Sequence, residues 1–596
     1  MPLQELLIIV QGAGPILRRK GYGMTGPPLL KGQRGFHIDI SMVRKYSFVM
    51  TQEIRKKIEA LFPCEKDIPR EIDFAPCGGT YEGGMTYLID GELRAWSGRT
   101  SEVLSPVCIR TDMGLVRRKI GLEARLTTEE AISALEAAVR AWDHGRGAWP
   151  VMRVQERAER LSAFAIMMRS VRDQSVRMLM WETGKSLSDS EKEFDRTVQY
   201  ITDTVEALKE TDRAGARFSS NSGVLAQIRR SPLGVVLCMG PFNYPLNETF
   251  TTLIPALAMG NTAVVKLPRY GSLCQIPLLH AFKECFPRGV VNIINGDGRD
   301  VAGPIMESGQ VAALAFIGSS RAANILKKQH PMPNRLRCIL GLDAKNPGII
   351  LPDADIDLAV RECVTGALSF NGQRCTALKI LFVHRSIADA FVKRLSDAVD
   401  ALPFGLPWEK GVRITPLPEP GAPDKMRSLV DDAVKKGASI CNSNGGISNE
   451  SFYFPAVVYP VTSDMQLYTV EQFGPVVPVA VFDNEHEVFD YIVSSNFGQQ
   501  ASIFGKDPKR VGPLIDVFAN QVCRINLNAQ CQRGPDVYPF TGRKDSAEGT
   551  LSVSDALRCF SIRSMVAATE SDAGKELLRE IIHERSSSFV NTDYLF

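Results

Sequence analysis

Two long stretches of this sequence alternate short β-rich runs with helical runs, and this alternation constrains the fold more than any other feature. The first stretch, Leu233–Leu351, contains the runs GVVLC, TAVVK, VVNII, LAFI and PGIIL, with helical segments such as Ile276–Phe286 between them. The second, Leu378–Asn528, contains LKILFV, AVVYPV, VVPVAVF, ASIF and CRINL. This pattern is typical of parallel sheets with crossover helices. The sequence therefore predicts two α/β layers, the first with the pattern of a nucleotide-binding domain.

Helical periodicity precedes the first layer. Thr127 and Glu130 have the spacing of a capping box ahead of a helix with one apolar face. The members of that face are Ile132, Leu135, Val139 and Trp142. A long helical region is predicted from Arg153 to about Thr211, and the polar segment DRAGARFSSNSG follows it as a connection.

Length and composition describe a multidomain globular protein. At 596 residues the chain is too long for one compact core, which predicts roughly two to four domains. Hydrophobic residues make up 44% and charged residues 23%, as in soluble globular chains. A net charge of +3 argues against nucleic acid or an anionic membrane as a partner. The 13 cysteines lack paired metal-ligand spacing, which favours reduced thiols, no metal site and a cytoplasmic location.

The first 49 residues are rich in basic side chains. Their composition is compatible with an organelle transit peptide. The preferred alternative is a poorly structured extension, or a start of translation assigned too early, because MTQEIRKKIEALFP from Met50 opens an amphipathic helix. The apolar run Leu6–Val10 is much shorter than the roughly 20 residues that a membrane span requires.

One cysteine stands in a distinctive loop. The segment Ser369–Lys379 reads SFNGQRCTALK and delivers Cys375 directly before a strand. An isolated cysteine is most often a small buried apolar side chain. Arg374 beside Cys375 should favour the thiolate, and a thiolate that adds to an aldehyde gives a thiohemiacetal from which hydride can leave. Cys375 is therefore a candidate nucleophile.

Four motifs occur in the order seen in the aldehyde dehydrogenase superfamily: GPFNYP, FIGSS, FNGQRC and EQFGP. The chain resembles that superfamily over nearly its whole length. The resemblance implies an α/β, aldehyde dehydrogenase-like fold with a doubly wound cofactor domain, an α/β catalytic domain and a small oligomerisation hairpin. It implies Cys375 as nucleophile, and Asn243 as the amide that stabilises the oxyanion together with the Cys375 N–H. Without the resemblance, Asn243 is a turn asparagine.

The resemblance also implies a dinucleotide cofactor. Lys266, at the end of TAVVK, matches the lysine that reaches the adenine ribose. Arg269 stands where NAD-preferring members commonly carry an acidic residue, so its charge favours the 2′-phosphate of NADP. The alternative interpretation of Arg269 is an exposed surface arginine.

Two further motifs match cofactor-contacting positions. Gly318 and Ser319 match the turn at a helix start that meets the pyrophosphate. Glu471 and Phe473 match the positions that hold the nicotinamide ribose and ring. The loop NGDGRD at residues 295–300 contains a GxG spacing, which by itself assigns no phosphate.

Within the superfamily the chain looks most like the non-phosphorylating glyceraldehyde-3-phosphate dehydrogenases, which hold the substrate phosphate between arginines. Residues matching that subfamily's substrate-contacting positions are Arg196, Tyr244, Arg374, Thr376 and Arg533. Each arginine alone is more often a solvated surface residue, but a dianion needs such convergence. The resemblance implies oxidation of D-glyceraldehyde 3-phosphate to 3-phosphoglycerate with NADP, without inorganic phosphate. The rivals are a dehydrogenase for another anionic aldehyde or semialdehyde, and a non-catalytic ligand-binding protein.

One motif departs from the family. The glutamate of a motif like LELGGK normally activates the water that hydrolyses the thioester. Here the stretch reads LGLDAK, with Gly341 at the position of the glutamate. We expect a substitute carboxylate, Asp343 or Glu248. The alternatives are transfer of the thioester to phosphate or coenzyme A, and a protein that no longer turns over.

These observations predict four segments. Residues 1–49 are an extension, residues 50–345 the NADP-binding domain, residues 346–545 the catalytic domain, and residues 546–596 a C-terminal oligomerisation segment. The hairpin Ala214–Ser231 is expected to bridge subunits together with the tail Arg558–Phe596. The family resemblance implies a homo-dimer or homo-tetramer.

Overall fold

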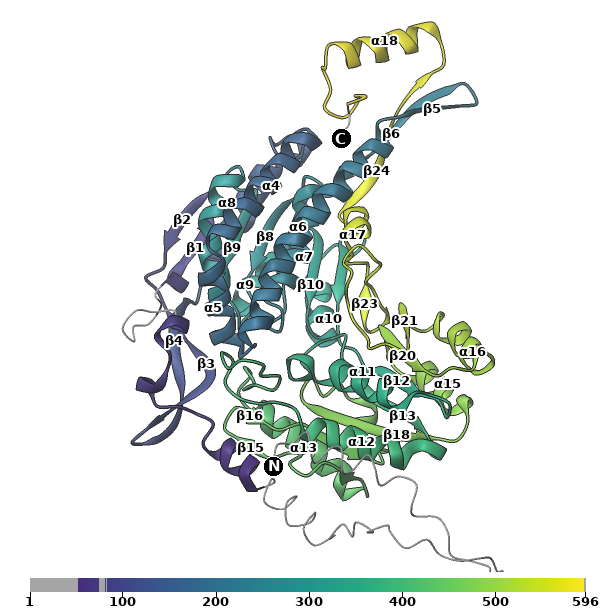
Figure 1. Cartoon of the computed structure of the whole chain (residues 1–596). Helices are drawn as coiled ribbons and strands as arrows, with labels where there is room; N and C mark the ends of the chain where they lie inside the picture. The colour runs from purple at the N-terminus through teal and green to yellow at the C-terminus, as the bar shows by residue number, and fades with distance from the viewer. Residues whose placement is uncertain (1–51, 74–80, 82, 594–596) are drawn as a thin grey trace, which may run out of the picture. The chain divides into compact units, whose positions relative to one another are not determined.

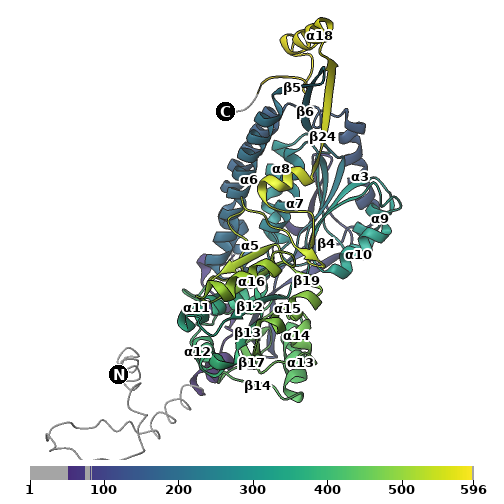
Figure 2. The same ribbon diagram turned by 90° about the vertical axis from the view of Figure 1, so that its right-hand side faces the viewer.

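The computed structural model describes residues 52–73, 81 and 83–593 (Figures 1 and 2). The elements below all belong to the unit formed by residues 51–596. The predictions for residues 1–49 lie outside the described residues. Within the described part of the chain, no helix combines the length and apolar character needed to cross a membrane.

The first α/β layer is an eight-stranded sheet in the order β2-β1-β9-β8-β7-β10-β11-β23. From β7 the chain moves outward through β8 and β9, and then returns to the other side of β7 for β10 and β11. The strand order therefore reverses between β7 and β10, as in a doubly wound sheet. The strands are β1 Thr86–Ile89, β2 Glu92–Ala95, β7 Val235–Met239, β8 Thr262–Lys266, β9 Val291–Ile294, β10 Val311–Ile317, β11 Arg337–Gly341 and β23 Ala547–Glu548.

Helices cover both faces of this sheet because its central strands are apolar on both sides. Val235 and Leu237 pack on one face with α3 Thr128–Trp142, α9 Gly298–Glu307 and α10 Ser320–Gln329. Val236 and Cys238 pack on the opposite face. The helices there are α4 Val154–Ser170, α5 Arg172–Thr183, α6 Leu187–Gly215, α7 Asn247–Ala258 and α8 Leu279–Cys285. A continuous apolar run is the expected signature of such a doubly covered parallel strand.

Two helical predictions are refined by the structure. The capping box of Thr127 and Glu130 is present at the start of α3. The buried face of α3 is centred on small residues and Leu135, whereas Ile132 and Val139 are only partly buried. The region predicted as one long helix is divided into α4, α5 and α6, because Gly184, with φ 69°, ends α5 and the Ser186 side chain caps α6.

The second α/β layer is a seven-stranded sheet in the order β14-β17-β18-β13-β12-β20-β21. Its strands are β12 Asn346–Ile350, β13 Leu378–His384, β14 Ser439–Ile440, β17 Ala456–Tyr459, β18 Val476–Phe482, β20 Gln500–Phe504 and β21 Arg524–Leu527. All neighbouring pairs are parallel except β14 with β17. Its helices are α11 Ile356–Leu368, α12 Ala388–Asp400, α13 Ala422–Lys435, α14 Gln466–Thr469, α15 Glu485–Ser494 and α16 Pro508–Phe518.

A small three-stranded sheet joins the middle of the chain to its end. The predicted hairpin is formed by β5 Phe218–Asn221 and β6 Val224–Pro232, and β24 Ser561–Thr569 pairs along β6. Helix α17 Val553–Cys559 precedes β24, and α18 Asp572–His583 follows it. An antiparallel ribbon of β3 Thr100–Thr111 and β4 Gly114–Ala124 was not anticipated from the sequence.

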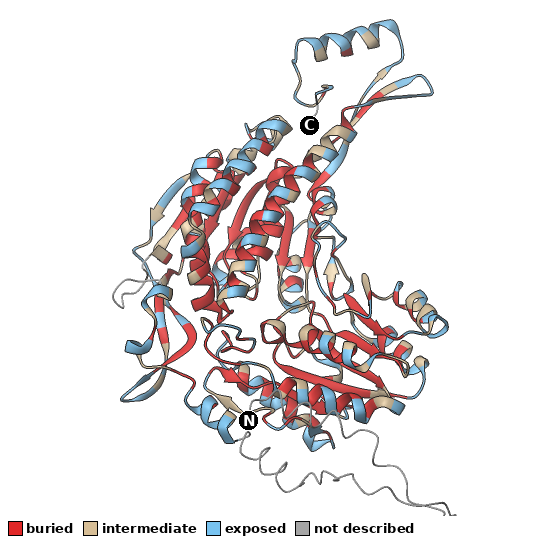
Figure 3. Cartoon of the chain, viewed as in Figure 1, coloured by how far each residue is buried: buried red, intermediate tan, exposed pale blue. Residues whose placement is uncertain are grey.

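Burial follows this division. Figure 3 shows buried strands at the centre of both large sheets, whereas β5 and α18 are largely exposed. Figures 1 and 2 both show β5, β6, β24 and α18 projecting from the first layer. Exposed apolar side chains on these elements include Val224, Met565 and Leu577.

Candidate active site

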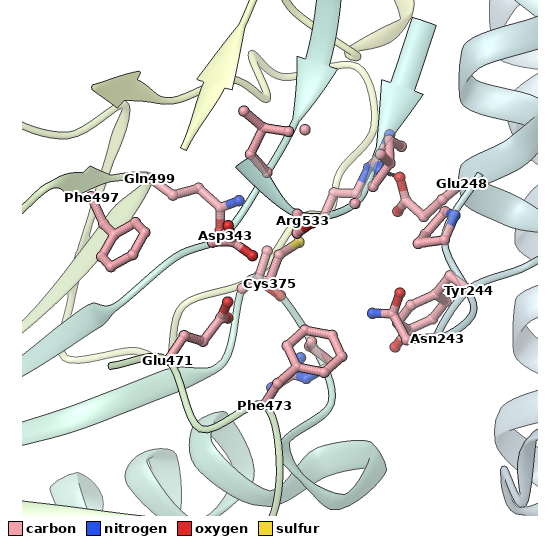
Figure 4. A pocket seen from close by; sticks show the side chains of 18 of the residues that line it. Asn243, Tyr244, Glu248, Asp343, Cys375, Glu471, Phe473, Phe497, Gln499 and Arg533 are labelled. Atoms are coloured by element: carbon pink, nitrogen blue, oxygen red, sulfur yellow. Dashed lines mark hydrogen bonds and ion pairs between the residues drawn. The ribbon is translucent and has the colours of Figure 1, made fainter. Parts of the chain in front are cut away.

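A cavity of about 820 Å³ lies between the two large sheets. The loops that follow β7, β10 and β11 line one side of it. These loops leave the carboxyl ends of strands at the point where the strand order reverses, which is where open α/β sheets bind ligands. The loop before β13, the turn before β18 and residues near β19 Phe497–Gly498 line the other side (Figure 4).

Three successive left-handed residues lead into the loop of Cys375. Phe370, Asn371 and Gly372 have φ of 49°, 55° and 71°. A β-carbon on Gly372 would lie 2.6 Å from a main-chain carbonyl oxygen, so the position requires glycine. The Asn371 amide is fixed because it both donates to and accepts from Thr415. Non-glycine residues in this conformation are strained and persist only where the surroundings hold them. The fold therefore fixes the position of the sulfur.

The thiol of Cys375 is electrostatically disfavoured as an anion. Burial raises its pKa to about 11, and the negative charge of Glu248 acts in the same direction. The Gln499 side chain and the Arg533 charge oppose this rise by favouring the thiolate. The thiol is therefore predominantly protonated at neutral pH.

The expected lowering of the thiol pKa by Arg374 is not found. The Arg374 guanidinium turns to the end of α11, where it donates to the carbonyl oxygens of Thr365 (3.3 Å) and Gly366 (2.9 Å). The residue lines the cavity. Its Nη2 is used by the main chain, whereas its buried Nε has no hydrogen-bond partner among the described residues. The position of Arg374 next to Cys375 in the sequence does not determine where its side chain points.

Asn243 is held against the nucleophile loop. Its Nδ2 donates to the carbonyl oxygen of Gln373 over 2.7 Å, two residues before Cys375. The main-chain carbonyl oxygen of Asn243 accepts from the buried Lys185 ammonium at 2.8 Å. Lys185 in turn forms an ion pair with Glu193. The amide predicted to bind the oxyanion thus lies beside the loop that carries the nucleophile.

The position of the absent glutamate is part of a strand. Gly341 ends β11, and a β-carbon there would lie 3.3 Å from a Leu551 methyl group. Asp343 lines the cavity, and its Oδ2 accepts from the backbone N–H (2.8 Å) and hydroxyl (2.6 Å) of Ser320. Asp343 therefore binds the N-terminus of α10, a favourable place for a negative charge.

The two arginines that were predicted to bind the substrate's anion already form ion pairs with carboxylates of the protein. Arg196 binds Asp536 through two parallel hydrogen bonds of 2.8 and 2.7 Å. Arg533 donates from Nε to Asp536 over 3.2 Å and forms an ion pair with Glu248 through Nη1. Two guanidinium groups thus meet two carboxylates, so the cluster is formally neutral. Figure 4 shows Glu248 beside Arg533 at the edge of the cavity.

Tyr244 and Thr376 complete the set predicted to contact substrate. Both line the cavity. The Tyr244 ring packs edge-on against Phe370 with centroids 6.0 Å apart, and the Lys185 ammonium lies 3.6 Å from its centroid. Cation–π contact of this kind holds the ring in place.

Glu471 and Phe473 project from the turn before β18. Glu471 forms an ion pair of 3.4 Å with buried Lys379, yet its Oε1 accepts no hydrogen bond from any described residue. Burial raises the pKa of this carboxyl. The Phe473 ring lies 5.7 Å from that of Phe242 across the cavity. A buried carboxylate oxygen that accepts no hydrogen bond has capacity for a ligand that brings hydroxyl groups.

A second cavity, of about 200 Å³, contains Lys266 and Arg269. Arg125 lines it as well, and burial lowers the pKa of the Lys266 ammonium. Arg269 is exposed and forms no ion pair with any described residue. The lining of this cavity also includes Glu123 and Asp297. The predicted phosphate-facing arginine is therefore available to bind an anion.

Gly318 and Ser319 lie where the sequence places them, between β10 and α10, and both line the large cavity. The Ser319 hydroxyl caps α10 by accepting from the Ala322 N–H at 3.3 Å. Since Asp343 takes the Ser320 N–H, this helix start carries internal acceptors that the motif alone did not reveal.

Three cavity-related residues were missed by sequence reasoning. Gln499 is almost fully buried beside Cys375, and its Oε1 accepts no hydrogen bond from a described residue. Lys185 holds Asn243, and Asp536 joins the two arginines. Only Asp536 had a usable signal, because it stands three residues after Arg533 in the segment QRGPD.

Comparison with known proteins identifies the family. The family model described as "Aldehyde dehydrogenase family" matches residues 116–566. The chain belongs to the aldehyde dehydrogenase family. The predicted aldehyde dehydrogenase-like fold is confirmed, and family membership places the protein among the oxidoreductases.

Relatives and solved structures agree with this membership. The chain is 33% identical to an NADP-dependent glyceraldehyde-3-phosphate dehydrogenase of Streptococcus equinus, over 72% of this chain and 88% of the relative. It is 29% identical to a protein of the same name from Arabidopsis thaliana, over 79% of this chain and 92% of the relative. The crystal structure of NADP-dependent glyceraldehyde-3-phosphate dehydrogenase from Bacillus halodurans, complexed with NADP, is similar with a TM-score of 0.72 and 27% identity, covering 83% of this chain and 100% of that chain. Succinate-semialdehyde dehydrogenase from Burkholderia pseudomallei gives a TM-score of 0.73 and 26% identity, covering 81% and 98%.

Proposed function

We propose that this aldehyde dehydrogenase oxidises D-glyceraldehyde 3-phosphate to 3-phosphoglycerate with NADP, without inorganic phosphate. The observation that carries the proposal is one cavity that contains Cys375, Asn243 and the two arginines Arg196 and Arg533. A nucleophile, an oxyanion donor and an anion site in a shared space are what a small anionic aldehyde requires. The names of the relatives from Streptococcus equinus and Arabidopsis thaliana support the substrate and the cofactor.

In the first half-reaction, the Cys375 sulfur adds to the aldehyde carbon and forms a thiohemiacetal. The Asn243 amide and the Cys375 backbone N–H donate to the developing oxyanion. Loss of hydride then converts the thiohemiacetal into a thioester on Cys375. Because burial holds the thiol pKa near 11, only a minor thiolate fraction reacts at neutral pH.

The described residues fit NADP. Glu471, whose Oε1 forms an ion pair with Lys379 but accepts no hydrogen bond from a described residue, suits ribose hydroxyls, and Phe473 lies beside it on the same turn. Lys266 suits the adenine ribose, and exposed Arg269 suits a 2′-phosphate. NADP, when bound, supplies the hydride acceptor. Gly318 and Ser319 border the cavity where a pyrophosphate would approach α10.

In the second half-reaction, water hydrolyses the thioester, and a carboxylate must take its proton. Both candidates are held, Asp343 by Ser320 at the start of α10 and Glu248 by Arg533. Glu248 is favoured because its charge acts on the Cys375 thiol. The attacking oxygen bonds to the carbonyl carbon, the carbon–sulfur bond breaks, and Cys375 leaves as the thiolate.

A carboxylate-bearing semialdehyde is the second candidate substrate. Arg196 already binds the carboxylate of Asp536 in a two-point geometry, so the cluster accommodates carboxylates as well as it would a phosphate. Comparing kcat/KM for glyceraldehyde 3-phosphate and for succinate semialdehyde separates the two.

We also propose that the protein forms a homo-dimer or homo-tetramer through the sheet of β5, β6 and β24. Its outer strands β5 and β24 each pair on one side only. Exposed strand edges of this kind are normally covered by a partner. Sedimentation equilibrium tests this assembly.

A step-resolved experiment tests the proposed reaction. With glyceraldehyde 3-phosphate and NADP, the enzyme should release a burst of NADPH roughly equal to the active sites, and Cys375→Ser should abolish it. Glu248→Gln should keep the burst and lower the steady rate by about 10²-fold, and Asp343→Asn should not. An acyl phosphate or acyl-coenzyme A product would overturn the hydrolytic reaction. Absence of a burst from folded protein would support a non-catalytic binding protein.

A further inference from the structure

Every nitrogen of the Arg533 guanidinium is engaged by an acceptor of the protein itself. Nη1 is paired with Glu248, Nε donates to Asp536 over 3.2 Å, and Nη2 donates to the carbonyl oxygen of Leu551 over 3.3 Å. The side chain is only 5% exposed. Three of its five N–H groups thus already have acceptors. An incoming substrate anion therefore competes with these acceptors for Arg533.

The three acceptors differ in how firmly they are held. Asp536 is fixed because Arg196 donates two short hydrogen bonds to its carboxylate. The Leu551 acceptor is fixed because it is a main-chain carbonyl oxygen. Besides its ion pair with Arg533, the Glu248 carboxylate accepts a hydrogen bond of 3.3 Å from the hydroxyl of Thr251 on its own helix. Of the two carboxylate acceptors, Glu248 is therefore the less firmly anchored.

A displaced Glu248 remains in the space where the reaction occurs. Glu248 and Cys375 line the same cavity. Its negative charge has the largest effect of any charged group in raising the pKa of the Cys375 thiol. The carboxylate and the sulfur thus share one cavity, and the charge of Glu248 acts on the sulfur.

Release from Arg533 also changes the chemistry of a carboxylate. A guanidinium partner stabilises the ionised form and so weakens the carboxylate as a proton acceptor. When the substrate's anion takes the place of the carboxylate on the guanidinium, the carboxylate loses its cation and gains a like charge nearby. Both changes favour its protonation. The ion pair therefore keeps the Glu248 carboxylate occupied until an anionic substrate competes for Arg533.

We propose that the anionic group of the substrate displaces Glu248 from Arg533 and thereby releases the base that activates the hydrolytic water. The inference rests on the proposed function and deepens it. Water then adds to the thioester carbon, its proton passes to Glu248, and the carbon–sulfur bond breaks to give the carboxylic acid and the Cys375 thiolate. The proton on Glu248 returns to solvent when its pairing with Arg533 is restored.

The test supplies the two functional parts of the substrate, the aldehyde and the anion, as separate molecules. Propanal supplies a neutral aldehyde, and sulfate supplies an anion that is a poor nucleophile. With propanal and NADP, the full-length enzyme should show an NADPH burst followed by a slow steady rate. Sulfate should raise the steady rate by about tenfold or more without changing the burst amplitude, as expected when only deacylation is limiting. Potassium chloride at equal ionic strength should have no such effect.

Two matched variants identify the released carboxylate. Glu248→Gln should lose the acceleration by sulfate, whereas Asp343→Asn should retain it. Calorimetry should show tighter sulfate binding to Glu248→Gln than to wild type, by about tenfold, because no internal carboxylate competes for Arg533.

The outcomes separate this inference from the proposed function. A burst without acceleration by sulfate, or equal acceleration in Glu248→Gln, overturns the release of Glu248 and leaves the oxidation intact. Equal sulfate affinity in wild type and Glu248→Gln overturns the displacement itself, even if propanal is not oxidised. Failure of the burst with every aldehyde overturns the proposed function alone.

Discussion

The two cationic sites of this protein differ in whether their positive charge is already paired. Arg269 is exposed beside the small cavity and forms no ion pair with a described residue. Arg196 and Arg533 at the large cavity are both bound to carboxylates, and Arg533 is buried. In sequence all three are simply arginines inside matched motifs.

The difference determines the energetics of binding. An unpaired cation binds an anion at the cost of its own hydration and side-chain freedom. A buried, paired cation must exchange one carboxylate for another anion, so its contribution is a difference between two ion pairs. The first site should contribute affinity, and the second should contribute discrimination.

The largest expected effect is on stability. Arg533→Met leaves Glu248 as a buried carboxylate without a cation, so the free energy of unfolding should fall by about 3–5 kcal/mol. Arg269→Met should change it by less than about 0.5 kcal/mol, as for exposed sites. Urea unfolding of both variants provides the comparison. Adding Glu248→Gln to Arg533→Met should recover part of the loss, and equal stability of the two single variants would break the comparison.

The next effect concerns the cofactor. Arg269→Glu removes a charge-assisted contact and adds repulsion, so NADP binding should weaken by about 2–4 kcal/mol. This corresponds to a dissociation constant roughly 30-fold or more higher. NAD affinity should change much less, and fluorescence titration measures both. A wild-type enzyme that does not prefer NADP over NAD would contradict the role given to Arg269.

A smaller effect should appear in thiol reactivity. The Glu248 charge raises the Cys375 pKa, so Glu248→Gln should lower it and increase the thiolate fraction at pH 8. The alkylation rate by iodoacetamide should rise by roughly tenfold for each unit of decrease in the pKa. Mass spectrometry of the Cys375 peptide follows the reaction. Asp343→Asn serves as the control, and an unchanged rate in Glu248→Gln would show that its charge does not reach the sulfur.

The smallest effect is expected at the start of the chain. Both cationic sites and all quoted motifs lie beyond Met50. Deleting residues 1–49 should therefore leave the kinetic constants and the stability of the protein essentially unchanged. Loss of soluble protein in the truncated form would contradict this expectation.

Most of the fold was readable from the sequence because its signals are local. The β-rich runs correspond to β7 to β10, β12, β13, β17, β18, β20 and β21, and the hairpin after α6 is present. The strand β11 and the ribbon of β3 and β4 were missed. Arg337–Gly341 is short, and the ribbon interleaves charged residues such as Arg117–Lys119 with apolar ones, so neither gave a clear apolar run.

The candidate site was readable where its chemistry lies within one motif. The residues that line the cavity include Cys375, Asn243 and Glu471. The Asn243 side chain also donates a hydrogen bond to the loop that carries the nucleophile. The pairing of Arg196 with Asp536 joins residues 340 positions apart, and that of Arg533 with Glu248 joins residues 285 apart. Such partners are set by tertiary packing, and no local pattern encodes them.

The pairing of β24 with β6 also has a consequence for biosynthesis. Strand β6 ends at Pro232, and its partner begins at Ser561, so the ribosome must add about 330 residues before the pair can form. At about 5–20 residues per second, this delay lasts on the order of 20–60 s. During that interval one side of β6 has hydrogen-bonding groups with no partner strand. Until Ser561–Thr569 has been synthesised, this edge of β6 can pair with strands of other chains.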